Sequence, residues 1–305
     1  MKRRALLLIN PLSRSGQTVG VQAAQQLRDQ DLDVMEAPID ELSLLSKTIC
    51  QYRDRVDLVI IGGGDGTLRF AIDGLLSTGL PLGILPLGTA NNLARSLGIP
   101  TRLSQACLTI ATGTHRVIDL GIVNGHYFFN VAGIGLSAEI NRRVSRTAKH
   151  RWGVLAYITT AFQVFRQAKS LDATIHYGAL TDAQTVSLKA KQITLCNGRY
   201  YGNGLIVADD AAIDDARLDL YGFDIQRWRQ VIRLLPELRW GHHSALPNVL
   251  YLAGTRFTIE TNVSRPVDVD GEILTTTPAT FEVKPKALRV LVPCSVGRMP
   301  ILQSS

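Results

Sequence analysis

The sequence predicts an α/β chain in which an N-terminal doubly wound parallel sheet precedes a C-terminal antiparallel, β-sandwich-like domain. Up to about residue 120, short apolar runs alternate with helical patterns, which is typical of a parallel sheet covered by helices. Beyond that point, β-branched and aromatic stretches recur, and Asn124-Gly125 is a strong signal for a hairpin turn. We therefore expect two domains, 1–122 and 123–305, with the C-terminal end able to pack back on the first.

The first domain contains four apolar runs, each short enough for a strand and each followed by a helical pattern. The run at Val56–Ile61 ends in glycines and is expected to be buried on both faces of the sheet. The expected strands are Ala5–Ile9, Leu32–Met35, Val56–Ile61 and Leu82–Leu85, and the expected helices are Val19–Arg28, Leu42–Tyr52, Leu68–Leu76 and Leu93–Leu97.

The second domain is expected to be mainly antiparallel strands, interrupted by three helical patterns. The expected strands are Tyr127–Val131, Ala173–Tyr177, Lys191–Cys196, Leu218–Tyr221, Arg256–Glu260, Ala279–Val283 and Leu288–Val292. The expected helices are Ala138–Val144, Val154–Lys169 and Ile225–Trp240.

The glycine turn, Gly62-Gly63-Gly64-Asp65-Gly66-Thr67, joins a buried strand to a helix. Its glycines let backbone N–H groups approach a ligand closely, and the start of a helix suits a phosphate group. The alternative is a tight turn in which Asp65 caps the helix. No Gly-Lys-Ser/Thr follows, and Thr67 replaces the last glycine of a dinucleotide fingerprint, so neither of those phosphate-binding motifs is present.

Two further polar turns follow strands, one beginning at Asn10 and one containing Thr89. Ligands of doubly wound sheets bind at the carboxyl ends of the strands, where such turns meet. The three turns together therefore predict one binding cleft.

Composition excludes several classes of protein. No run of 18 apolar residues could span a membrane, and the apolar run after Met1–Arg4 is too short for a signal peptide, so we expect a cytoplasmic protein. The net charge of +7 favours an acidic partner, such as a nucleotide or an anionic membrane. Aromatic residues are not interleaved with the basic runs, which argues against nucleic acid.

Five segments of the chain form a recognisable set: GGGDGT (62–67), LPLGTANNLARSLGIP (85–100), VIDLGIVNG (117–125), NVAGIG (130–135) and VDVDGE (267–272). Together they resemble the diacylglycerol kinase catalytic-domain family, and most of all its small soluble bacterial lipid kinases. The resemblance covers nearly the whole chain, and GGGDGT alone is the less specific part because NAD kinases share it.

The resemblance implies a lipid kinase that uses ATP and Mg²⁺ to phosphorylate diacylglycerol or a related lipid alcohol. In this family the active cleft lies between an α/β domain and a β-sandwich domain. Asp65 would either face the metal or hold its loop. The family's nucleotide-binding positions correspond to Asn10, Pro11, Gly63, Gly64, Asp65, Gly66, Thr67 and Thr89.

The Asp270-Gly271-Glu272 tripeptide matches the family's catalytic tripeptide. By resemblance Glu272 accepts the proton of the lipid hydroxyl, with Asp270 supporting or sharing that role. Residues two apart on an extended strand face the same side, so we expect both carboxylates to face one site. The alternative is a hairpin turn, for which Asp-Gly is also typical.

The loop around Asp215 matches a structural Mg²⁺ site of the family, with the backbone carbonyls of Ala212 and Arg217 as further ligands. Ala216 stands where the family has glycine, which puts the site in doubt if that position needs a positive φ. The alternative is a solvated acidic loop. A second departure is Arg69-Phe70, where the family often has Asn-Glu.

Two basic segments suggest peripheral contact with an anionic membrane, which holds the lipid alcohol. They are Arg142–Arg151 and the amphipathic helix expected within Gln226–Trp240, whose apolar face could instead pack on its own domain. The sequence leaves a homodimer open. The rival functions are a kinase for a soluble alcohol or NAD, and a catalytically silent nucleotide-binding regulator.

Overall fold

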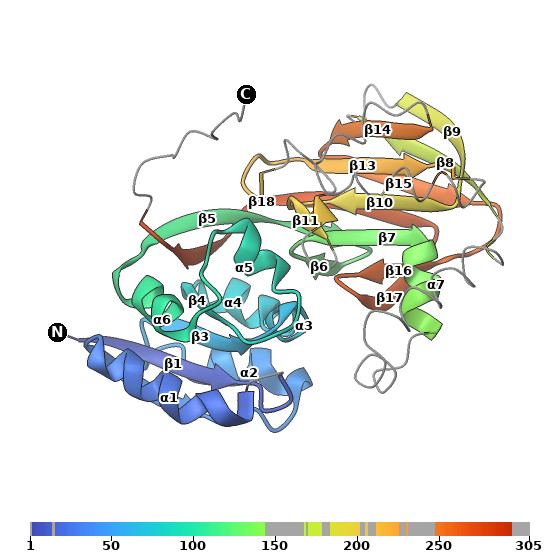
Figure 1. Cartoon of the computed structure of the whole chain (residues 1–305). Coiled ribbons are helices and arrows are strands. Elements are labelled where there is room, and N and C mark those ends of the chain that lie inside the picture. The colour runs from blue at the N-terminus through green and yellow to red at the C-terminus, as the bar shows by residue number, and fades with distance from the viewer. Residues whose placement is uncertain are drawn as a thin grey trace, which may run out of the picture.

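The computed structural model consists of two lobes that lie side by side (Figure 1). It describes residues 2–13, 16–143, 168, 170–178, 184–201, 205–206, 212–225, 230 and 248–294. The expected helices at Val154–Lys169 and Ile225–Trp240, and the basic segment Arg142–Arg151, fall largely outside these residues.

The N-terminal lobe is built on four parallel strands in the order β2-β1-β3-β4. Every residue of β3 is buried, as the continuous apolar run predicted. The strands are β1 (Arg3–Ile9), β2 (Leu32–Ala37), β3 (Leu58–Gly63) and β4 (Leu82–Pro86). The helices are α1 (Gly16–Asp29), η1 (Leu42–Leu44), α2 (Leu45–Gln51), α3 (Asp65–Arg69), α4 (Ile72–Thr78), α5 (Asn92–Ser96) and α6 (Leu103–Thr112).

Helices cover both faces of this sheet, which confirms the doubly wound arrangement. Alternate residues of β1 enter different cores, because neighbouring side chains of a strand point to opposite faces. Leu6 and Leu8 pack with α2 and α4, whereas Ala5 and Leu7 pack with α1 and α6. The helix expected at Leu68–Leu76 is two helices, α3 and α4, and α6 was not expected.

The C-terminal lobe is a sandwich of two antiparallel sheets around one apolar core, which confirms the predicted fold class. One sheet has the order β14-β13-β10-β7-β16-β17, and β15-β8-β9 faces it. The strands are β7 (Val131–Gly135), β8 (Leu171–Tyr177), β9 (Gln184–Ala190), β10 (Gln192–Cys196), β13 (Leu218–Phe223), β14 (Val249–Gly254), β15 (Arg256–Thr261), β16 (Pro266–Val269) and β17 (Glu272–Thr276). Also described are α7 (Leu136–Arg143) and the short pair β11 (Tyr200–Tyr201) and β12 (Leu205–Ile206).

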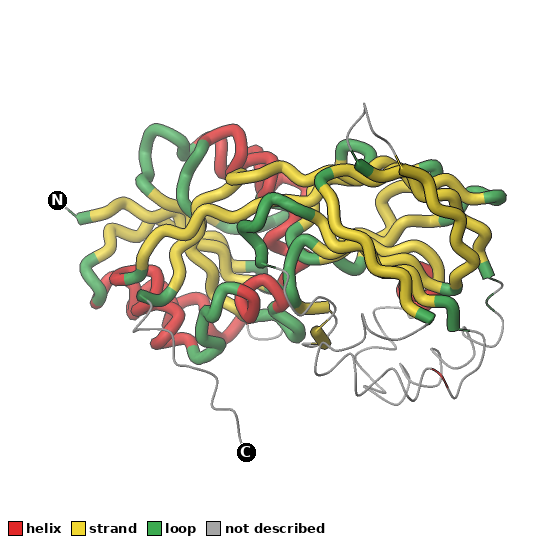
Figure 2. The backbone as a smooth tube through the Cα atoms, turned by 90° about the horizontal axis from the view of Figure 1, so that it is seen from above, coloured by secondary structure: helices red, strands yellow, loops and turns green. Residues whose placement is uncertain are grey.

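One long strand, β18 (Ala279–Val292), runs through both lobes. Its first half pairs with β15, its second half reaches β4, and β5 (Thr114–Val123) pairs with it along its length. Figure 2 shows these strands passing from one lobe into the other. The two strands expected at Ala279–Val283 and Leu288–Val292 are therefore one strand, with a register shift between Lys284 and Leu288.

The Asn124-Gly125 turn joins β5 to β6 (His126–Phe128), as its sequence predicted. Both residues have a positive φ, 45° and 85°, which two-residue hairpin turns of this kind require. The strand expected at Tyr127–Val131 is wrong, because the chain there ends β6 and begins β7.

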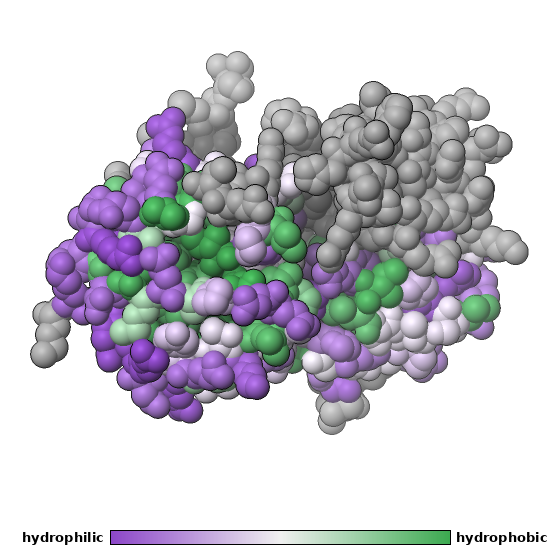
Figure 3. All heavy atoms as spheres, turned by 90° about the horizontal axis from the view of Figure 1, so that it is seen from below, coloured by the Kyte–Doolittle hydropathy of each residue, from purple (hydrophilic) through white to green (hydrophobic). Residues whose placement is uncertain are grey.

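The described surface mixes polar and apolar residues, as the hydropathy colours of the N-terminal lobe show (Figure 3). Within the part of the chain that the structure describes, no helix is long and apolar enough to cross a membrane. The large apolar side chains exposed there come from separate elements and loops: Leu12, Val21, Leu44, Leu108, Val117, Val263 and Ile273.

We expect the stability of the N-terminal lobe to depend on the C-terminal end of β18. Leu291 is 1% exposed and packs in the core shared with α1 and α6, so Leu291→Ala should lower the free energy of unfolding by about 2–5 kcal/mol. Leu108→Ala is the control, because Leu108 is 48% exposed on α6. Urea unfolding measures both. Equal, small losses would mean that this strand is not part of the lobe's core.

Candidate active site between the lobes

The three polar turns of the N-terminal lobe lie together at the carboxyl ends of β1, β3 and β4, as parallel pairing dictates. Asn10 links two of them, because its backbone N–H donates to Gly62 O (2.9 Å) and its Nδ2 donates to Thr67 Oγ1 (2.8 Å). Asn10 and Thr67 are both buried, whereas Pro11 and Thr89 are exposed. The structure thus brings the predicted nucleotide-binding turns to one place.

Glycine is required at two places in these turns, where a neighbouring side chain or backbone lies too close to leave room for a Cβ. A Cβ on Gly63 would lie 2.6 Å from the Cβ of Thr67, and one on Gly88 would lie 2.4 Å from the Cα of Gly64. A Cβ on Gly66 would meet nothing within 4 Å. The glycine turn is therefore closed on the side of the neighbouring turn and open at Gly66.

Asp65 holds the two turns together. Its Oδ2 accepts the N–H of Asn92 and its Oδ1 accepts the N–H of Leu93, both at 3.0 Å. The helix that Asp65 caps is therefore α5, rather than α3 as the tight-turn alternative expected. Sequence reasoning missed Asn91, which has φ 50° and accepts the N–H of Gly88 at 3.0 Å.

Asp270 and Gly271 form the turn of the β16–β17 hairpin, with φ values of 47° and 95°. The alternative, a hairpin turn, is therefore correct for the backbone at Asp270 and Gly271. The Asp270 carboxylate accepts three backbone N–H groups, from Phe129 at 2.7 Å and from Asn130 and Val131 at 3.1 Å each. The expectation that Asp270 and Glu272 face one site from an extended strand is wrong, because Asp270 turns back to the start of β7.

Burial raises the pKa of Asp270 to about 6. The N–H donors of Phe129, Val131 and Asn130 oppose this rise, and the negative charge of Asp65 adds to it. Asp65 belongs to the N-terminal lobe and Asp270 to the C-terminal lobe. The contact between Arg69 and Glu272, described next, brings the helix after the glycine turn to the strand that follows this hairpin.

Glu272, the first residue of β17, pairs with Arg69, the last residue of α3. The Arg69 Nη2 donates to Oε2 of Glu272, and the two side chains are 12% and 33% exposed. The Arg69 guanidinium also stacks on Phe70, 4.5 Å from the ring centre. Arg69 was identified in the sequence only as a departure from the family pattern, so this contact was missed.

The Asp215 loop does not have the ligand arrangement that the resemblance implied. Ala212 and Arg217 contact the Asp215 carboxylate through their backbone N–H groups (3.2 Å each), and the Arg217 Nε lies 3.2 Å from it. A carboxylate that accepts these donors does not fit a hard cation as it stands, since Mg²⁺ requires oxygen ligands. We therefore assign no catalytic step to a metal at Asp215.

Ala216 does have a positive φ, 60°, the strained conformation considered for the glycine position of the family. Its N–H donates to Oδ2 of buried Asp119 at 2.7 Å. Asp119 Oδ1 accepts the N–H of Lys286 at 2.6 Å, which ties this loop to the irregular part of β18. Neighbouring Asp214 pairs with Arg116, which lowers the pKa of that carboxyl.

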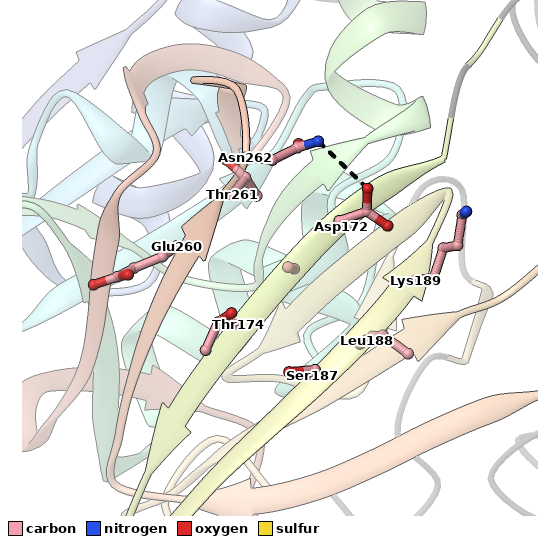
Figure 4. Close-up of a pocket in the computed structure, with 9 residues that line it drawn as sticks. Asp172, Thr174, Ser187, Leu188, Lys189, Glu260, Thr261 and Asn262 are labelled. Carbon is pink, nitrogen blue, oxygen red and sulfur yellow. Dashed lines mark hydrogen bonds between the residues drawn. The ribbon is translucent and has the colours of Figure 1, made fainter.

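A shallow polar pocket on the C-terminal lobe lies elsewhere (Figure 4). Ala173 and Ile175 of β8 point into the core, so Asp172 and Thr174 point outward, and Asn262 donates to Asp172 at 3.3 Å. None of the predicted site residues lines this pocket. We therefore place the candidate site between the glycine turn and Glu272.

The two lobes match two family models in sequence. Residues 4–123 match the diacylglycerol kinase catalytic domain, and residues 130–292 match the YegS C-terminal NAD kinase β-sandwich-like domain. A Bacillus subtilis protein named diacylglycerol kinase is 30% identical over 241 residues, which cover 78% of this chain and 78% of that protein. An uncharacterised protein of Synechocystis sp. is 32% identical over 267 residues, which cover 83% of this chain and 60% of that protein.

The fold also has a solved counterpart. A crystal structure described as a diacylglycerol kinase from Bacillus anthracis has a TM-score of 0.79 at 24% identity, covering 97% of this chain and 99% of that chain. This likeness shows the two-lobed fold. The sequence matches to both lobes, and the 30% identity to the Bacillus subtilis protein, show that the chain belongs to the diacylglycerol kinase catalytic-domain family.

Proposed function

We propose that the chain is an ATP-dependent lipid kinase, which transfers the γ-phosphate to the hydroxyl of diacylglycerol or a related lipid alcohol. The observation that carries this is the contact between the lobes: Arg69 ends the helix that the glycine turn begins, and it pairs with Glu272. A nucleotide held by that turn has its terminal phosphate near the carboxylate. Membership of the family supports the same activity.

The phosphates lie over the open side of the glycine turn, at Gly66. Phosphoryl transfer needs positioning and charge neutralisation more than covalent chemistry. The bond from Asn10 to Thr67 and the two bonds accepted by Asp65 keep the turn rigid before ATP arrives. Mg²⁺ bound to ATP supplies further charge neutralisation.

Glu272 is the proton acceptor in this proposal. The Asp270 carboxylate already accepts three backbone N–H groups, so we assign it to holding the loop that begins β7. Glu272 is partly exposed and starts a strand at the edge of its sheet. As the lipid oxygen attacks the γ-phosphorus, Glu272 takes the hydroxyl proton and ADP leaves.

The rival acceptor is NAD or another soluble alcohol, which the NAD kinase-like description of the C-terminal family model favours. The deciding experiment supplies labelled ATP and Mg²⁺ with a total lipid extract, with NAD, or with neither, and identifies the product by mass. A labelled lipid supports the proposal, and labelled NADP supports the rival. No product with either acceptor would indicate a silent regulator.

We also propose that the protein binds anionic membrane surfaces peripherally, as its net charge of +7 suggests. Co-sedimentation with anionic and with neutral liposomes tests this. Equal binding to both would exclude an electrostatic contribution.

Gly66→Val should weaken ATP binding by at least tenfold in isothermal calorimetry, since its side chain enters the space proposed for phosphate. Its melting temperature should change little, because a Cβ at this position meets nothing within 4 Å. Gly64 is a poorer choice, since its Cβ would press on Gly88 at 3.1 Å and move the turns. Unchanged ATP affinity in folded Gly66→Val would mean that the phosphates do not bind at this turn.

Glu272→Gln should reduce lipid phosphorylation by roughly 10²–10⁴-fold, because glutamine keeps the shape of the side chain but cannot take the proton. The measurements are the initial rate and the melting temperature of the same sample. A rate within tenfold of the wild type, at unchanged stability, would mean that another group is the base.

Asp270 should make stability depend on pH. Its pKa is about 6 in the folded protein, against an ordinary value of 3.8, so the unfolded chain ionises first as pH rises. The stability present below about pH 4 is then lost progressively up to about pH 6, by up to about 3 kcal/mol. Asp270→Asn should lack this loss. Urea unfolding of both proteins from pH 4 to pH 7 measures the difference, and a constant difference would contradict the raised pKa.

A further inference from the structure

Arg69 occupies the space between the turn proposed to hold phosphates and the proposed base. Arg69 is the second residue after the glycine turn, and its Nη2 donates across the lobes to Glu272. Its side chain is largely buried, and Phe70 covers one face of the guanidinium. The arginine is therefore fixed where the reacting groups would meet.

The guanidinium of Arg69 has an unused donor. Its Nε–H is buried and has no hydrogen-bond partner among the described residues. Nε–H and Nη2–H lie on the same edge of a guanidinium, and that edge matches two oxygens of one phosphate. Glu272 takes only one donor of this edge, so the edge is built for a ligand with two acceptor oxygens.

The negative charges at the site also favour a contact between the Arg69 guanidinium and a phosphate. The carboxylate of Glu272 borders the proposed phosphate position, and the carboxylates of Asp65 and Asp270 are held by backbone N–H groups in the turns of the two lobes that flank it. The ATP tail adds further negative charge, and the resulting repulsion has to be offset by a cation. Arg69 already contacts one of these carboxylates.

We propose, building on the proposed function, that Arg69 exchanges partners during the reaction. Without nucleotide it holds Glu272 in place. When ATP binds, Nε–H and Nη2–H turn to two oxygens of the γ-phosphate, and Glu272 is released toward the acceptor hydroxyl. Arg69 thus binds the transferred group and also positions the base.

All bonds, the proton and the electron pair are then accounted for in one transfer step. The bond from the γ-phosphorus to the β–γ bridging oxygen breaks, and a bond from that phosphorus to the acceptor oxygen forms. The hydroxyl proton passes to Glu272, and ADP carries away the electron pair of the broken bond. After the phosphorylated product leaves and Glu272 loses its proton to water, Arg69 returns to it.

The test compares the affinities of the full-length protein for ATP and for ADP, each with Mg²⁺, by isothermal calorimetry. Arg69→Met should weaken ATP binding by at least tenfold and ADP binding by less than twofold, because ADP has no γ-phosphate. Arg69→Lys keeps the charge without the fork and should fall between Arg69→Met and the wild type. Glu272→Gln should tighten ATP binding severalfold, since the arginine no longer has to leave a carboxylate.

Arg256→Met is the matched control, because it removes another arginine–glutamate pair, with Glu282 on β15 and β18. It should leave both affinities unchanged. Equal effects of Arg69→Met on ATP and ADP, or unchanged ATP affinity in Glu272→Gln, would show that the pair only braces the lobes. These binding measurements need no acceptor, so they decide the role of Arg69 even if the wild-type protein phosphorylates no lipid.

Discussion

The backbone pairing of β5 with β18 is the constraint on which the arrangement of this molecule depends. The two strands pair from one lobe into the other, and β18 also pairs with β15 at one end and with β4 at the other. The ladder continues on both sides of the register shift between Lys284 and Leu288, and Asp119 holds the irregular part between them by accepting the N–H of Lys286. It therefore fixes the position of the C-terminal sandwich, and of its β16–β17 hairpin, relative to the turns of the parallel sheet.

Three aspartates use this frame in the same way, by accepting backbone N–H groups of distant segments. Asp65 joins two turns of the N-terminal lobe, and Asp270 holds the start of β7. Asp119 ties the 212–217 loop to β18, whereas Asp215 accepts N–H groups only from within that loop. A carboxylate that is shielded from water is costly unless its oxygens are satisfied, and Asp65, Asp119 and Asp270 each have their donors.

Glu272 differs from these aspartates because its partner across the lobes is a charged side chain rather than the backbone. A side-chain partner can move without unfolding a loop, whereas a backbone partner cannot. This difference is why we assign proton transfer to Glu272 and a structural role to Asp270. It also makes Arg69, which comes from the other lobe, the residue that connects nucleotide binding with the state of the base.

The sequence by itself determined the local features. The continuous apolar run of β3, the glycines after it, and Asn124-Gly125 each restrict the backbone within a few residues, so the parallel sheet, the glycine turn and the β5–β6 turn were predictable. Strand endings at one edge also brought Asn10 and Thr67 together as expected. The tertiary structure decided the rest: that residues 279–292 form one strand, that the Asp215 loop presents N–H donors, and that Arg69 meets Glu272 across 203 residues. Periodicity and turn chemistry describe neighbours along the chain, whereas these contacts depend on the path the whole chain takes between them.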